Sequence, residues 1–439
     1  MFTTLKNAFK IKEIRDKILF TMVMLVVIRI GSQLPVPGVN GEFIKQWFES
    51  QTGGAFTFFD AITGGSFASM AVLALNINPY ITSSIIMQLL TIAIPKLEEM
   101  QRDGEDGRKK IASITRYVTV VLALVQATAM AVGFGNQGYL TEYNALSVIT
   151  AVATLTAGSA FLMWIGERIT EKGIGNGISI VLVINIVSRL PEDLSNLFNQ
   201  FVFKSGIAPA TAVLSAVIII AIIVAMVVLV IILNAGVRKI PVQYAKKMQG
   251  RKMVGGQTSS IPLKVNTSGV IPVIFAQSIM QFPIIICSFI GYKGTGVWAE
   301  ILNGLSSDNW CKPSQPLYSI GLVVYILLIV FFAYFYTSIT FNPLMVADNM
   351  KKQGGFIPGI RPGKPTSDYL NKVLNYIVFI GAVGLTIVSI IPFFFNGVFG
   401  ASVSFGGTSL IIIVSVVLET MKQVESQMMV RNYKGFLEG

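Results

Sequence analysis

The residues from Phe58 to Pro95, FFDAITGGSFASMAVLALNINPYITSSIIMQLLTIAIP, decide how this chain is organised. They begin with a short apolar piece that Gly64 and Gly65 interrupt, and Asn76 precedes a helix of span length that carries several hydroxyl and amide side chains. Broken helices and polar side chains are tolerated at membrane depth only inside protein or beside water. The stretch therefore predicts a protein that encloses a pore or a cavity.

Composition sets the class of the protein. The chain has 439 residues, of which 53% are hydrophobic and 13% are charged, and its mean hydropathy is +0.67. Because about 20 apolar residues cross a bilayer, this composition predicts a polytopic membrane protein. We expect ten spans, with the stretch at 56–73 forming a re-entrant half-helix between the first two. The spans are expected near 18–34, 76–95, 111–133, 147–169, 177–198, 211–234, 269–291, 317–340, 370–391 and 403–424.

Charge predicts the orientation. An even number of spans leaves both termini on one side, and placing them in the cytosol puts most of the 34 basic residues there. The basic segment 1–17 lacks a small-residue cleavage site, so we expect an amphipathic helix on the inner leaflet and not a signal peptide. The spans group into halves at 18–198 and 199–424 of opposite topology, before a cytosolic tail at 425–439. Such repeats are common where a site lies between the halves.

Several chemistries are disfavoured by what the chain lacks. It has no histidine, which argues against most membrane proteases and zinc sites, and we expect no metal and no cofactor. GIGNG at 173–177 lacks the Lys-Ser/Thr of a phosphate-binding loop, so energy must come from a partner. Cys287 and Cys311 could form a disulfide, but two unpaired thiols are favoured because no cysteine pattern supports pairing.

Two long cytosolic loops, at 235–268 and 341–368, are expected to dock a partner. The first contains no acid, and the second contains QGGFIPGIRPGKPT, a turn-rich tip around Arg361. The basic residues of the first loop are Arg238, Lys239, Lys246, Lys247, Arg251, Lys252 and Lys264. Membrane orientation and lipid headgroups explain part of this charge. A surface for an acidic protein or for RNA explains more of it.

Seven motifs resemble one family in their order and spacing. They are NPYITSS at 78–84, QLL at 88–90, EKGIGNGIS at 171–179, RKIPVQYAKK at 238–247, PLKVNTSGVIPVI at 262–274, GGFIPGIRPG at 354–363 and FGGTSLII at 405–412. As far as about Val430 the chain is similar to the SecY family, the large subunit of the bacterial protein-conducting channel. The resemblance implies an all-α polytopic fold, with ten transmembrane helices in two inverted five-helix halves that form a clamshell around an hourglass pore.

The resemblance also implies functional segments. A plug at about 60–73 would close the pore, and it contains Asp60, Gly64, Gly65, Ser66, Phe67, Ala68, Ser69 and Met70. An aliphatic ring at the constriction would consist of Ile81, Ile85, Ile178, Leu182, Ile274 and Ile412. A lateral gate would be bordered by Ser83, Ser84, Gln88, Thr267 and Gln277. Partner docking would use Arg238, Lys246, Lys247, Arg251, Lys252, Arg361 and Lys364.

The implied function is a channel in the bacterial plasma membrane that passes unfolded secretory polypeptides outward and releases apolar segments sideways into the lipid bilayer. The implied partners are SecE-like and SecG-like small membrane subunits, the SecA motor ATPase, the ribosome, and signal sequences with their nascent chains. An apolar ring resists wetting and therefore ion flow.

Two other classes remain open at this stage. A solute transporter with inverted repeats would also explain the broken polar helix, but it predicts an ionisable coupling residue within a span. Arg29 lies near the outer end of the first span and is expected to snorkel to the surface, so it does not fill that role. A membrane enzyme is disfavoured by the missing histidines and by the lack of paired carboxylates at depth.

Overall fold

A computed structural model of the chain describes residues 8–39, 44, 60, 63–136, 138, 140, 142–203, 209–244, 247–249, 252–254, 258–289, 296–399 and 407–434. Its longer helices overlap every predicted span range. The α-helices are α2 (Lys12–Gly31), α5 (Asn78–Ala93), α6 (Pro95–Arg102), α7 (Glu105–Asn136), α8 (Ala145–Lys172), α9 (Gly177–Phe201), α10 (Pro209–Ala235), α11 (Ile271–Phe289), α12 (Val297–Leu305), α13 (Ile320–Thr340), α14 (Pro343–Lys352), α15 (Lys364–Phe399) and α16 (Gly407–Lys434).

Within the described residues, 6 helices are long and apolar enough to cross a membrane, or 7 if the bent pair α5 and α6 forms one span. That pair turns by 107°. The bend follows from Pro95, because the residue before a proline avoids the helical region and Ile94 is extended at φ −112° and ψ 110°. The protein is therefore a largely helical membrane protein, and the other predicted crossings, such as α2, α9 and α11, remain predictions.

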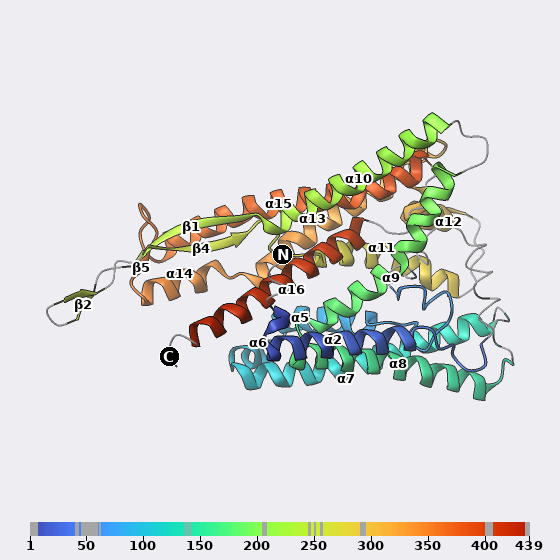
Figure 1. Cartoon of the computed structure of the whole chain (residues 1–439), viewed down its shortest axis with the longest axis horizontal. Coiled ribbons are helices and arrows are strands. Elements are labelled where there is room, and N and C mark those ends of the chain that lie inside the picture. The colour runs from blue at the N-terminus through green and yellow to red at the C-terminus, as the bar shows by residue number, and fades with distance from the viewer. Residues whose placement is uncertain are drawn as a thin grey trace.

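The helices form two groups that lie side by side (Figure 1). Helices α2, α5, α7 and α8 lie on one side, and α10, α13 and α15 lie on the other, with α9, α11 and α16 between them. Glycines let α8 and the start of α9 approach closely, since a Cβ on Gly177 would lie 1.9 Å from the carbonyl oxygen of Gly166. Small residues at such contacts are typical of membrane helix pairs.

The two loops predicted to be cytosolic contain strands, so the prediction of an all-α fold is wrong for this part. Strands β1 (Val237–Tyr244), β4 (Thr258–Lys264) and β5 (Gly355–Phe356) form an antiparallel sheet in the order β4-β1-β5. Strands β2 (Lys247–Gln249) and β3 (Lys252–Val254) form a separate hairpin. The strands lie beyond one end of the helices (Figure 1).

Alternation of apolar side chains explains why β1 is a strand. Ile240 and Val242 are buried against Leu370 and Ile377 of α15, and the residues between and beside them are exposed. A period of two directs these side chains to one face, where an apolar core covers them. The sheet is thus fixed by packing on α15, and it joins the loop at 235–268 to the loop at 341–368 through the pairing of Gln243 with Phe356.

The predicted re-entrant half-helix does not continue past Thr63: Asp60 and Thr63 are helical, but the chain from Gly64 on is not. From Gly64 to Ile77 the chain runs through successive turns and one isolated bridge between Ala71 and Pro35. Gly64, Gly65, Met70 and Asn76 all have positive φ, which interrupts an α-helix. Residues 45–59, 61 and 62 lie outside the described part of the chain.

The predicted separate helix at 1–17 differs as well. Residues 1–7 lie outside the described part. The helical conformation of residues 8–10 is interrupted by a bend at Ile11, and α2 starts at Lys12. Residues 12–17 therefore belong to the same helix as the predicted first span. Helix α2 is continuous from these basic residues into the apolar sequence that follows them.

Candidate functional site

An apolar cluster at the middle of the molecule contains five of the six predicted ring side chains. They come from four different helices: Ile81 from α5, Ile178 and Leu182 from α9, Ile274 from α11 and Ile412 from α16. Leu182 is 7% exposed and Ile412 is 4% exposed, and the other three are partly buried in the same cluster. Residues as distant in the sequence as Ile81 and Ile412 thus meet in one apolar cluster, which we call the ring cluster.

The remaining predicted ring residue lies apart from it. Ile85 is partly buried on α5 but is not among the residues of the ring cluster. A helix advances about 5.4 Å per turn, so Ile85 lies one turn along α5 from Ile81. The structure therefore gathers the ring without Ile85.

The segment from Val72 to Ile77 packs directly on the ring cluster. Leu73 is 3% exposed and Ile77 is 0% exposed, and both belong to the cluster, with Val72 against it. The apolar surface of the predicted plug thus continues into that of the ring.

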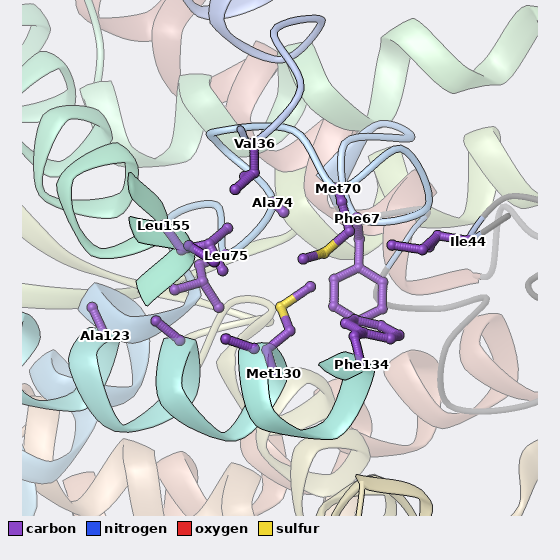
Figure 2. Close-up of a cluster of buried hydrophobic side chains, with 13 residues drawn as sticks. Val36, Ile44, Phe67, Met70, Ala74, Leu75, Ala123, Met130, Phe134 and Leu155 are labelled. Atoms are coloured by element: carbon purple, nitrogen blue, oxygen red, sulfur yellow. The ribbon is translucent and has the colours of Figure 1, made fainter. Parts of the chain in front are cut away.

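The rest of the predicted plug packs on α7 and α8. Figure 2 shows Phe67 and Met70 of this segment pointing toward Met130 and Phe134 of α7. All four side chains are at least nine-tenths buried. Most of the predicted plug residues are buried or half-buried, and Ser69 is exposed. This apolar contact holds the segment against the N-terminal group of helices.

A buried amide pair fixes the end of the segment. Asn76 has φ 53° and its side-chain oxygen accepts a hydrogen bond of 3.0 Å from Asn185 of α9. The backbone oxygen of Asn76 accepts another from Ser159 of α8, at 3.1 Å. A buried polar group costs free energy unless it is paired, so these bonds define one position for the start of α5.

Charged groups hold the other end. The carboxylate of Asp60, which is 2% exposed, forms an ion pair with the guanidinium of Arg189 on α9. The same guanidinium lies 3.6 Å from the carboxylate of Asp193, one turn further along α9. Arg29 does not snorkel as predicted: its Nη1 atom is buried, and it lies 3.1 Å from where a Cβ on Gly64 would be.

Two of the predicted gate residues lie inside contacts between helices. Ser83 is fully buried and donates a hydrogen bond of 2.8 Å to the backbone oxygen of Thr115 on α7. Gln277 is buried and accepts a bond of 3.3 Å from Tyr325 of α13. Both polar side chains are hydrogen-bonded to a neighbouring helix, because a buried polar group without a partner costs free energy.

The other three predicted gate residues have less buried positions. Gln88 is exposed on α5, Ser84 is half-buried on the same helix, and Thr267 is half-buried just before α11. The hydroxyl of Thr267 donates to the backbone oxygen of Lys264. These three residues remain available to border an opening.

The sheet brings basic residues of both predicted docking loops, 235–268 and 341–368, to one end of the molecule. Arg238 is exposed on β1, Arg361 is exposed in the tip after β5, and Lys364 is exposed at the start of α15. The backbone oxygen of Arg361 accepts a hydrogen bond of 2.8 Å from Thr366, which orders the tip. Lys246 and Arg251 lie outside the described residues. Lys247 pairs with Val254, and Lys252 with Gln249, in the β2–β3 hairpin.

Both cysteines are free thiols, as the sequence favoured. Cys311 lies in the connection between α12 and α13, and partial burial raises the pKa of its thiol. Nearby, Tyr318 donates a hydrogen bond of 2.6 Å to Glu300, and this bond raises the pKa of its phenol. Asn176 caps α9, which confirms that GIGNG is a turn at the start of a helix.

Comparison with known proteins agrees with this arrangement. The SecY family model matches residues 71–421. The chain belongs to the SecY family. A protein translocase subunit SecY of Halalkalibacterium halodurans is 42% identical over 444 residues, and that of Bacillus subtilis is 43% identical over 444 residues, each with 100% of both chains covered.

Solved structures of the SecY and Sec61 type have the same fold. A structure described as "The plug domain of the SecY protein stablizes the closed state of the translocation channel and maintains a membrane seal" matches with TM-score 0.65 and 20% identity over 94% of this chain and 92% of that one. "Sec61 in the Canine ribosome-channel complex from the endoplasmic reticulum" matches with TM-score 0.61 and 18% identity, again over 94% and 92%.

Sequence reasoning missed the polar partners of the predicted plug segment. Asn185, Arg189 and Asp193 all fall within the predicted span at 177–198, and no partner was predicted for any of them. An amide inside the apolar run IVLVINIV was a readable signal, because polar groups within spans usually have a partner. No sequence signal identifies Asp60 as the residue that pairs with Arg189.

Proposed function

We propose that this SecY-family chain is the pore subunit of a bacterial protein-conducting channel. The observation that carries this proposal is the meeting of Ile81, Ile178, Leu182, Ile274 and Ile412 in one apolar cluster, with the turn-rich segment packed on it. A closed aliphatic constriction resists wetting, so it blocks ions when no polypeptide is present. Branched apolar side chains form no hydrogen bonds with a passing chain, so many sequences can pass.

The segment from Asp60 to Ile77 acts as the plug in this proposal. It is seated by apolar contacts on two sides and by polar bonds at its two ends, with few regular backbone bonds within it. Because most of its backbone bonds close single turns, this segment can leave its seat without first unfolding a long helix. The plug and the ring therefore seal the channel together and open together.

The transport route runs outward through ten spans in two inverted halves, with both termini in the cytosol of a bacterial cell. Apolar segments leave sideways beside Ser84, Gln88 and Thr267. Each apolar residue contributes only about −0.3 to −0.6 kcal/mol at the membrane centre, so the exit decision is a sum over many residues. The other two predicted gate residues are hydrogen-bonded to neighbouring helices, Ser83 to α7 and Gln277 to α13.

The proposed partners follow from the exposed basic end. Arg238, Arg361 and Lys364 present positive charge from two loops that one sheet joins, which supports docking of the ribosome and of a SecA-type motor. Small SecE-like and SecG-like subunits complete the membrane complex. The chain itself is proposed to have no catalytic site and no cofactor, so the motor or the ribosome supplies the energy.

Photo-crosslinking tests the proposal. A photoreactive amino acid at Ile81 or Ile274 should crosslink to a secretory polypeptide stalled during export. The matched control is Val217 on α10, which is 58% exposed on the outside of the helix bundle and should not crosslink to the hydrophilic part of the chain. Crosslinks from Val217 but not from Ile81 or Ile274 would show that polypeptides do not pass through the ring cluster.

A further inference from the structure

We infer that the ion pair between Asp60 and Arg189 is the latch that holds the plug shut, and that it sets how strictly the channel discriminates between signal sequences. This inference rests on the proposed function, and it assigns to Arg189 the role of a positioning residue for the plug. Three observations support it: the geometry of Asp60, the surroundings of Arg189, and the close approach of the segment to α9.

Asp60 links the internal fold of the plug to its seat. One oxygen of its carboxylate accepts a hydrogen bond of 2.8 Å from the backbone N–H of Ala68, which closes the loop between them. The other oxygen meets Arg189. The backbone oxygen of Asp60 also accepts bonds from Gly65 and Thr63. Loss of the Arg189 contact would therefore release a segment that Asp60 still keeps folded.

Burial increases the contribution of this ion pair to the closed position of the plug. The side chains of Asp60 and Arg189 are 3% and 20% exposed, so neither charge is well solvated. A surface ion pair contributes little, but removal of one partner from a buried pair leaves a charge without compensation. Arg189 also offers a planar fork that binds a carboxylate through two nitrogens, which a lysine cannot do.

Asp193 lowers the free-energy cost of releasing the plug. Its carboxylate lies 3.6 Å from Nε of Arg189, which is too long for a hydrogen bond but close enough for an ion pair. When the plug leaves with Asp60, Asp193 remains beside Arg189 on the same face of α9. Arg189 therefore loses one carboxylate but keeps the other, and opening does not leave it as an isolated buried cation.

The backbone of the plug is closest to α9 beside this latch. A Cβ on Gly64 would lie 2.6 Å from the backbone oxygen of Asn185 and 2.8 Å from the hydroxyl of Ser188. Gly64 also has φ +67°, which a side chain would strain. The segment can thus sit against α9 only with glycine at this position. Asp60 and Arg189 lock this close contact from one side.

A double-mutant cycle tests the latch. Asp60→Asn keeps the oxygen that accepts from Ala68 and removes the charge, and Arg189→Gln removes the cation. The variants are reconstituted in proteoliposomes with the small subunits, and resting ion flux is measured without a substrate. We expect each single variant to raise the flux about tenfold, the usual scale of one charged hydrogen bond. The double variant should exceed neither single variant, because both remove the same interaction.

A second readout separates the latch from a general loss of stability. In cells, each latch variant should increase export of a substrate with a defective signal sequence relative to one with an intact signal, whereas misfolding would lower both. Glu192→Gln is the matched control, because Glu192 is an exposed acid on the same turn of α9 and should leave flux and export ratio unchanged. If Arg189→Gln is not inserted, Arg189→Lys keeps the charge without the fork and should give a smaller increase.

The outcomes are distinct. Additive effects in the double variant, or a resting flux and export ratio equal to those of the parent chain, would overturn the latch. If the parent channel exports an intact substrate while the latch variants behave like it, only the latch is wrong. If the parent chain supports no export with its partners, the proposed function itself fails.

Discussion

Replacement of Ile412 by asparagine should open the channel at rest. Ile412 is 4% exposed on α16 and contacts the ring cluster, so the change removes apolar burial worth about 1.5–3 kcal/mol. It also buries an amide without a partner, at a cost of about 1–3 kcal/mol. Both costs fall on the closed state, because the open state wets this position.

Even the lower end of this range has a large effect. The lower ends of the two costs sum to about 2.5 kcal/mol, which changes the ratio of closed to open channels about 60-fold. We expect a comparable increase in resting ion conductance of channels in planar bilayers, and export of substrates with defective signals. The conservative change Ile412→Val should have a small effect, since it removes one methylene and typically costs about 0.5–1.5 kcal/mol.

A control variant distinguishes an effect on the ring cluster from a general effect on helix α16. Val417 lies on α16 about one turn further and is 45% exposed, so Val417→Asn places the same amide on the same helix outside the ring cluster. It should not raise conductance. If Ile412→Asn leaves conductance and signal discrimination unchanged, or if Val417→Asn changes them equally, the ring cluster is not the seal.

Three further outcomes are expected. Arg361→Glu should impair export in cells while the protein still inserts in the membrane, whereas Lys351→Glu on α14, exposed but outside the predicted docking set, should not; normal export by the first variant would remove Arg361 from the docking surface. A cysteine in place of Ser66, which is 1% exposed, should form a disulfide with a cysteine in the outer segment of a small subunit only during translocation, and a crosslink that is equally strong without substrate would contradict plug movement. In a variant without the other cysteine, Cys311 should be alkylated by a maleimide more slowly at pH 7 than an unhindered thiol and faster as pH rises, because burial raises its pKa and the thiolate is the reactive form; mass spectrometry would measure this, and a rate equal to that of a model peptide would contradict it.

Much of the helical fold could be predicted from the sequence because hydropathy is local. A run such as 213–233 contains no charge and must be covered by lipid or protein, whatever the rest of the chain does. Motifs such as GVIPVI and GGTSLII could place Ile274 and Ile412 in a ring only through resemblance to a family. Their meeting with Leu182 depends on four helices that are distant in sequence, so no local pattern contains it.

The sheet and the plug show where local patterns fail. Strand β1 looked like a basic docking loop because its alternation is short and its apolar face is covered by α14 and α15, far along the chain. The plug looked like a half-helix because its composition is apolar, but positive φ at Met70 and Asn76 is set by contacts with α7, α8 and α9. Propensity yields to tertiary packing at such positions.

The sequence by itself determined that FFDAITGGSFASMAVLALNINPYITSSIIMQLLTIAIP cannot be an ordinary span, because glycines and amides at that depth need protein or water around them. It also determined the membrane class, the basic face and, by resemblance, the family. Only the tertiary structure decided what the stretch contacts: Leu73 on the ring, Asn76 against Asn185, and Asp60 against Arg189. These residues are distant in the sequence but pair in the fold, because a buried charge or amide costs free energy unless a partner compensates it.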